Sequence, residues 1–262
     1  KSSEKGVSSF QAFALALSGR IGTGNIAGVA TAIAMGGPGS IFWMWIIAFL
    51  GGASAFIEAT LGQIYKEVKE GQYRGGPAFY IEKGLGIKWY AILFAIVTMI
   101  SMSLLLPGVQ SNSIALSMET AFNVPVEITG GVVVALLAMI ILGGVKRIGK
   151  VAEIIVPFMA MGYILLAVVI IALNVTEIPN VVRLIIGSAF NTEAAFSGVF
   201  GMAISWGIKR GIYSNEAGQG TAPHAAAAAE VSHPAKQGLV QAFSVYIDTL
   251  FVCTATAFMI LF

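Results

Sequence analysis

The chain has 262 residues, of which 57% are hydrophobic and 11% are charged, with a mean hydropathy of +0.85 and a net charge of +2. This composition excludes an ordinary soluble domain and is typical of a polytopic membrane protein. The single cysteine, Cys253, excludes a disulfide framework and a thiolate metal cluster. His224 and His233 lie in a loop without an acidic or cysteine cluster beside them, so we expect no metal centre there.

Seven apolar stretches approach the roughly 20 residues needed to span the hydrocarbon core. The predicted membrane segments are 10–35, 41–65, 89–117, 127–143, 151–174, 194–210 and 238–262. A shorter apolar stretch, 179–190, begins with Pro179 and is predicted to be a helix at the membrane interface.

The first segment contains a stretch, 17–28, that does not suit an unbroken helix in lipid. It holds four glycines together with Arg20 and Asn25. Each interior glycine costs about 1 kcal/mol of helix propensity, and a charge at the bilayer centre costs at least ~2.5 kcal/mol. We therefore predict a broken helix whose two ends face a ligand site. The alternative, a packing face with Gly24 and Gly28 at Gly-x-x-x-Gly spacing, leaves Arg20 and Asn25 unexplained.

The sixth segment is the second glycine-rich one. Four glycines, Gly198, Gly201, Gly207 and Gly211, are predicted to interrupt it. Two interrupted hydrophobic segments in corresponding halves indicate a transporter with inverted repeats and a midplane site. If five helices form each repeat, the first and sixth segments are equivalent and run in opposite directions.

Basic residues predict the orientation. With a cytoplasmic N-terminus, 13 of the 15 Lys and Arg residues fall on the inner side, Arg183 falls outside and Arg20 is buried. The positive-inside rule therefore places the N-terminus in the cytoplasm and the end of the seventh segment outside.

Three motifs resemble the alanine/glycine:cation symporter family over nearly the whole chain. They are the segments 18–30, 72–84 and 211–225, which read SGRIGTGNIAGVA, QYRGGPAFYIEKG and GIYSNEAGQGTAPHA. The resemblance implies an all-α, leucine-transporter-like fold of the amino acid/polyamine/organocation superfamily, a five-helix inverted repeat with broken first and sixth core helices. In that fold residues 1–262 are part of one transmembrane domain: 1–174 form the first repeat, and 175–262 begin the second, whose C-terminal part this chain lacks. The implied activity is sodium-coupled import of alanine or glycine by alternating access.

The residues at the predicted break suit an amino acid zwitterion. Free backbone N–H groups at a half-helix N-terminus favour a carboxylate, and the candidates are Gly22, Thr23, Gly24 and Asn25. Free carbonyls suit the ammonium group, and these are expected at 18–21 and at 200–203. For Asn25 the alternative is a helix cap.

Further candidates come from the third and sixth segments. Gln110 follows Pro107 by three positions and either contacts the substrate or makes a helix-to-helix hydrogen bond. Phe200 and Ile204 share a helix face beside Gly201 and either cover a small apolar side chain or belong to the core. Trp206 is a weaker candidate for the pocket boundary.

The coupling ion is expected to be sodium. Similarity to the superfamily implies that the backbone carbonyls of Ser18 and Ile21 form half of a sodium site, and that the other half lies on a helix absent from this chain. The three intramembrane charges need partners, and we predict that Arg20 pairs with Glu58 or Asp248. The alternative is that Arg20 reaches a cytoplasmic vestibule.

The sequence leaves several alternatives open. The loop 212–237, with a short helix at 225–229, is an inner gate or a plain connector, and the loop 66–88 is a hinge or a turn. The second hypothesis for the function is a transporter coupled to protons through Glu58 or Asp248. A channel or receptor is disfavoured because no repeated filter motif occurs, and an intramembrane enzyme because no nucleophile or metal-ligand motif lies in a span. We expect a lipid bilayer and a small amino acid as partners, and no nucleic acid.

Overall fold

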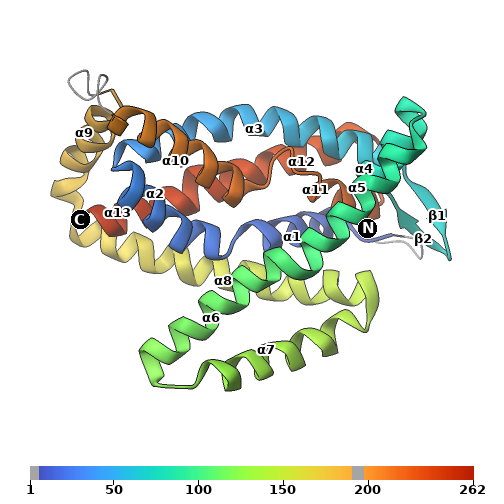
Figure 1. Cartoon of the computed structure of the whole chain (residues 1–262), viewed down its shortest axis with the longest axis horizontal. Helices are drawn as coiled ribbons and strands as arrows, with labels where there is room; N and C mark the ends of the chain where they lie inside the picture. The colour runs from blue at the N-terminus through green and yellow to red at the C-terminus, as the bar shows by residue number, and fades with distance from the viewer. Residues whose placement is uncertain (1–5, 191–197) are drawn as a thin grey trace.

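The structure is a computed structural model that describes residues 6–190 and 198–262, which form packed helices and one β-hairpin (Figure 1). The first half contains α1 (Ser9–Arg20), the π-helix η1 (Gly24–Gly28), α2 (Val29–Gly36), α3 (Gly39–Ile64), β1 (Glu67–Lys69), β2 (Gln72–Arg74), α4 (Pro77–Tyr80), the π-helix η2 (Ile81–Leu85), α5 (Lys88–Ile100), the π-helix η3 (Ser101–Leu105) and α6 (Leu106–Phe122). The second half contains α7 (Val126–Ile141), α8 (Gly144–Leu173), the 3-10 helix η4 (Val175–Glu177), α9 (Ile178–Ala189), α10 (Gly198–Asn215), α11 (Ala222–Ala228), α12 (Pro234–Tyr246), the π-helix η5 (Ile247–Cys253) and α13 (Thr254–Leu261).

Local sequence signals account for several helix ends. At the start of α1, Ser8 accepts from the Gln11 amide while the Gln11 side chain accepts from the Ser8 amide, which is a capping box. Pro234 lies in the first turn of α12, where its missing N–H costs nothing. Asn123 ends α6 in the left-handed conformation, with φ of 55°.

Four helices among the described residues are long and apolar enough to cross a membrane by length and composition. They are Gly39–Ile64, the combined Lys88–Phe122, Gly144–Leu173 and Pro234–Leu261, while Gly24–Gly36 and Val126–Ile141 are shorter apolar helices. The second, third, fifth and seventh predicted segments thus appear as single long helices. The first is interrupted, as predicted. The sixth lies partly outside the described residues.

Helix α3 is the centre of the packing, since α10 and α12 both lie along it (Figure 1). Small residues allow this approach. A Cβ built on Gly207 of α10 would lie 2.5 Å from the Ser40 carbonyl oxygen of α3, and one built on Gly52 would lie 2.5 Å from the Tyr246 hydroxyl. Glycine at these positions therefore serves helix packing. Helices α6 and α7 pack on each other and lie to one side of this layer (Figure 1).

Apolar side chains divide between a small interior and a large exposed surface. The main buried cluster joins α2, α3, α9 and α13 through residues such as Ala32, Met44, Ile185 and Ala257. By contrast, the 18-residue apolar window of Lys88–Phe122 has no buried residue. Large exposed apolar surfaces on long helices are what a bilayer requires.

The segment 66–88 is folded, and its hairpin departs from the predicted all-α chain. Strands β1 and β2 pair in antiparallel fashion, with Glu67 opposite Arg74. Glu67 contacts Lys83 at 2.6 Å and Lys69 at 3.2 Å, and these ammonium groups hold its pKa below the ordinary value. The ion pair with Lys83 ties the hairpin to η2.

The predicted interruption of the sixth segment is misplaced. Helix α10 runs unbroken from Gly198 to Asn215, and the chain leaves helical geometry only afterwards, where Gly218 and Gly220 both have φ of 80°. Gly201, Gly207 and Gly211 lie inside this continuous helix, and Gly198 is its first described residue. The short helix expected at 225–229 exists as α11, which is buried against α3 and α1 instead of forming a plain connector.

Candidate functional site

The first membrane helix is broken between Arg20 and Gly24, as predicted. Ile21 takes an extended conformation after α1, and the chain resumes in the π-helix η1. Two side chains hold the unwound backbone: Asn25 Oδ1 accepts from the Gly22 amide at 2.8 Å, and Gln110 Oε1 accepts from the Thr23 amide at 3.0 Å. The Thr23 hydroxyl donates to the same Gln110 oxygen at 2.5 Å. Gln110 of α6 therefore forms hydrogen bonds directly with the interrupted segment of the first helix.

A cavity of about 780 Å³ opens beside this break. Its walls come from α1, α6, α7 and the end of α10, and they include Ser18, Ile21, Gly24, Gln110, Tyr213 and Glu216. Apolar side chains such as Leu137 complete the lining. An apolar cavity with a few converging polar groups is the usual form of a small-molecule site.

The residues predicted from the sixth segment do not belong to the wall of this cavity. Phe200, Gly201, Ile204 and Trp206 do not line this cavity within the described part of the chain. Because α10 stays helical, Phe200 packs near Trp43, and a Cβ on Gly36 would meet the Trp206 side chain at 2.9 Å. The carbonyls of 200–203 lie within α10 instead of at a free helix end. Residues nearer the end of α10, Tyr213 and Glu216, take that place.

Behind the break, the two π-helices η1 and η5 meet through polar side chains. Asn25 Nδ2 donates to Asp248 Oδ1 at 2.6 Å, and the Ser214 and Thr249 hydroxyls each donate to Asp248 Oδ2 at 2.9 Å. All four side chains are buried. The Asp248 carboxylate thus lies among hydroxyl and amide groups at the centre of the molecule.

Arg20 does not pair with either predicted carboxylate. Its Nε donates to the Asn215 carbonyl at 2.6 Å, and its Nη1 donates to Gln241 Oε1 at 3.0 Å and to the Ser244 hydroxyl. No ion pair joins it to Glu58 or Asp248, both of which are described. It is buried, which also contradicts an exposed vestibule position. Neutral acceptors on α10 and α12 therefore take the place of the predicted carboxylate partner.

Glu58 of α3 instead holds the chain after α10. Its two carboxylate oxygens accept from the Gly218 amide at 3.2 Å and from the Gly220 amide at 3.1 Å. The turn between α10 and α11 is therefore fixed to α3.

A model of the sodium:alanine symporter family matches residues 1–262. The chain belongs to this family. It is 71% identical over its full length to a putative sodium/proton-dependent alanine carrier protein of Bacillus subtilis (strain 168) and 54% identical over its full length to a sodium/proton-dependent alanine carrier protein of Bacillus sp. (strain PS3). It is 48% identical over 98% of its length to a sodium/alanine symporter of Methanococcus maripaludis. The matches cover 54%, 59% and 58% of these proteins, so the chain spans about half the length of the curated relatives it matches.

Membership of the sodium:alanine symporter family, together with the long apolar helices, identifies a multi-pass protein of the cell membrane. Sodium is the coupling cation that the family name specifies. Sodium prefers hard oxygen ligands, and unwound helices in transporters supply them. The carboxylate of Asp248 and the hydroxyls of Ser214 and Thr249 are ligands of that type.

Sequence reasoning missed four residues of the cavity and of the cluster around Asp248: Tyr213, Glu216, Ser214 and Thr249. A signal was present, because Ser214, Asn215 and Glu216 are consecutive polar residues at the end of an apolar helix. Tyr213 carried no such signal. It lines the cavity, and its hydroxyl has no hydrogen-bond partner among the described residues.

Proposed function

We propose that the full-length protein is a sodium-coupled symporter that imports small amino acids, alanine or glycine, by alternating access. The cavity at the break of the first helix carries this proposal, because it joins backbone donors, carbonyls and an amide side chain in one place. Relatives named as alanine carriers support the substrate class. The substrate, its transport and its coupling are inferred from these two lines together.

The substrate carboxylate takes the position that Gln110 Oε1 now occupies. That oxygen already accepts from both donors of Thr23, so it lies where an anion would be bound. Gly22 permits the approach, since a Cβ there would lie 3.0 Å from the Gln110 amide. On binding, Gln110 would turn its Nε2 toward the carboxylate. The ammonium group would then face those carbonyls of 18–21 that do not bind sodium.

We place sodium at one of two sets of oxygens. The first is the pair of backbone carbonyls of Ser18 and Ile21, both at the cavity wall. The second is the cluster around Asp248, where a carboxylate and two hydroxyls converge within 2.9 Å. Asp248→Asn distinguishes them, since removal of the charge would raise the KM for sodium at least tenfold only if sodium binds there.

The wider architecture belongs to the same proposal. The interrupted first helix and the turn after α10 support a leucine-transporter-like inverted repeat, with residues 1–174 as the first repeat and 175–262 as the start of the second. The N-terminus is placed in the cytoplasm by the distribution of basic residues. In this frame α11 lies on the inner side of the site.

The test is uptake of labelled alanine into proteoliposomes that contain the full-length protein. Uptake is measured with external sodium, with potassium in its place, and with an imposed pH gradient. Sodium-dependent accumulation that glycine inhibits is the expected result. The absence of alanine uptake under all three conditions would overturn the proposal.

Proton coupling is the second candidate, and the buried carboxylate of Asp248 favours it. No cation lies within ion-pair distance of this carboxylate among the described residues. Two relatives are also named sodium/proton-dependent carriers. Uptake that ignores sodium and follows the pH gradient would select this mechanism, and Asp248→Asn would then abolish the response to the gradient.

A further inference from the structure

A stripe of buried polar residues runs along α12 into η5. Gln237, Gln241, Ser244 and Asp248 follow one another at intervals of four, three and four residues, so they share one helix face. The exposed fraction of each is 0%. Polar side chains buried inside a membrane protein are costly and are usually retained for function.

Arg20 of α1 contacts only the middle of this stripe. Its Nη1 donates to Gln241 and Ser244, whereas its Nη2 has no partner among the described residues. One turn away, both amide atoms of Gln237 are buried and lack partners within the described chain, as does Gln241 Nε2. A buried amide without a hydrogen bond destabilises the state in which it occurs. Leucine in place of Gln237 would make the present arrangement more stable, because it has no amide that needs a hydrogen bond.

We propose that Gln237 is a second position for the Arg20 guanidinium, which Arg20 reaches when α1 moves one helical turn along α12. The proposal rests on the alternating access of the proposed function. Gln237 is then a positioning residue: its Oε1 accepts from Arg20 in the other state, as Gln241 does in this one. A one-turn displacement of about 5.4 Å carries a side chain between positions four residues apart.

The ends of α1 are consistent with such a movement. Arg20 is the last residue of α1 and precedes the unwound residues 21–23. The chain can therefore bend at the C-terminal end of α1. At the other end, Val7 pairs with the last residue of α11 and the chain that follows it: its amide donates to the Ala228 carbonyl at 2.9 Å, and its carbonyl accepts from the Glu230 amide at 3.0 Å. Helix α12 begins at Pro234, near this bridge. Movement of Arg20 toward Gln237 therefore draws α1 toward the bridge and opens it.

The test compares three single variants of the full-length protein in proteoliposomes and in detergent. Gln237→Leu is expected to raise the unfolding temperature by about 2–4 °C, because it removes an unsatisfied buried amide. It should leave the KM for alanine within twofold and lower kcat at least tenfold. Gln241→Leu removes one of the three present acceptors of Arg20 and should lower the unfolding temperature. Leu239→Met, at an exposed position of α12, is the control for substitution on this helix and should change neither quantity.

A second measurement follows the movement without transport. Val7→Cys keeps the main-chain bridge, and its side chain is only 3% exposed, so a maleimide labels it only when the bridge opens. In that background Gln237→Glu offers Arg20 a carboxylate in the second position and should raise the labelling rate at least threefold. An unchanged labelling rate would overturn the proposal, as would a Gln237→Leu variant with unaltered kcat or a lower unfolding temperature. If the unmodified protein imports no alanine, the proposed function fails, whereas the labelling rate still decides the role of Gln237.

Discussion

At the scale of single residues, Gln110 has the most direct link to the proposed substrate. One of its oxygens accepts from both the amide and the hydroxyl of Thr23 at the break. Gln110→Leu removes the Nε2 donor that is proposed to turn toward the substrate carboxylate, and a hydrogen bond to a charged group is worth about 1.5–3 kcal/mol. The KM for alanine should rise about tenfold, since 1.4 kcal/mol corresponds to that factor.

The matched control for Gln110 is on the same helix. Ser117→Ala removes a hydroxyl that bonds only to the preceding turn at Ser113 and lies outside the cavity, so the KM should not change. Equal KM values for Gln110→Leu and Ser117→Ala would show that Gln110 merely joins two helices.

At the scale of elements, two glycines of α10 can be used to test whether glycine in this helix serves close packing or helix unwinding. A Cβ on Gly207 would lie 2.5 Å from both the Ser40 oxygen and Trp43 Cβ, whereas one on Gly201 meets nothing within 4 Å among the described residues. Gly207→Ala should lower the stability by about 1–3 kcal/mol through overpacking. Gly201→Ala should raise it by up to about 1 kcal/mol through helix propensity.

Thermal unfolding in detergent measures this pair of variants. Equal losses of stability would contradict the continuous α10, because both glycines would then have a conformational role. Gly201→Ala should also leave the KM for alanine unchanged, in keeping with its position outside the cavity.

Also at this scale, Glu58 connects α3 to the turn that follows α10. Glu58→Leu leaves the amides of Gly218 and Gly220 without acceptors, and each unsatisfied group costs about 1–3 kcal/mol. Glu58→Gln keeps one acceptor oxygen and should lose about half as much. Unfolding temperatures of the two variants, measured at the same pH, provide the comparison. If Leu and Gln had the same effect, the charge of Glu58 and not its hydrogen bonds would be the relevant property.

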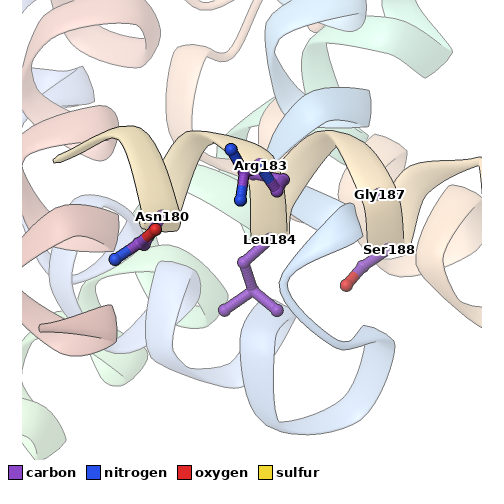
Figure 2. A pocket seen from close by; sticks show the side chains of 5 residues that line it. All are labelled: Asn180, Arg183, Leu184, Gly187 and Ser188. Carbon is purple, nitrogen blue, oxygen red and sulfur yellow. The ribbon is translucent and has the colours of Figure 1, made fainter. Parts of the chain in front are cut away.

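At the scale of the whole molecule, the orientation in the membrane is the prediction most open to test. Arg183 and Asn180 lie on the amphipathic helix α9 beside a shallow cavity (Figure 2), and α9 is predicted to face outward. Asn180→Cys should therefore react with an impermeant maleimide added to intact cells. Gln72→Cys, in the hairpin, should react only after the cells are opened. The reverse pattern would invert the proposed orientation.

The sequence alone determined the features that depend on local free energy. Long apolar stretches predicted the membrane helices, and glycines beside Arg20 and Asn25 predicted the break in the first helix, because lipid penalises both unwound backbone and buried charge. An amide within an apolar helix needs a partner, but the sequence left open whether Gln110 contacts the substrate or another helix, and the structure shows it bonded to Thr23 at the break.

Only the tertiary structure decided which distant groups meet. Glycines in α10 and in 17–28 look alike in sequence, yet Gly207 and Gly211 of α10 admit the neighbouring α3, whereas those in 17–28 accompany a break. Arg20 had three acidic residues as electrostatic neighbours, Asp248, Glu216 and Glu58, but it bonds to the Asn215 carbonyl, Gln241 and Ser244 instead. Its partners come from α10 and α12, about 200 residues away in sequence, and the packing of these helices on α3 sets which acceptors are within reach.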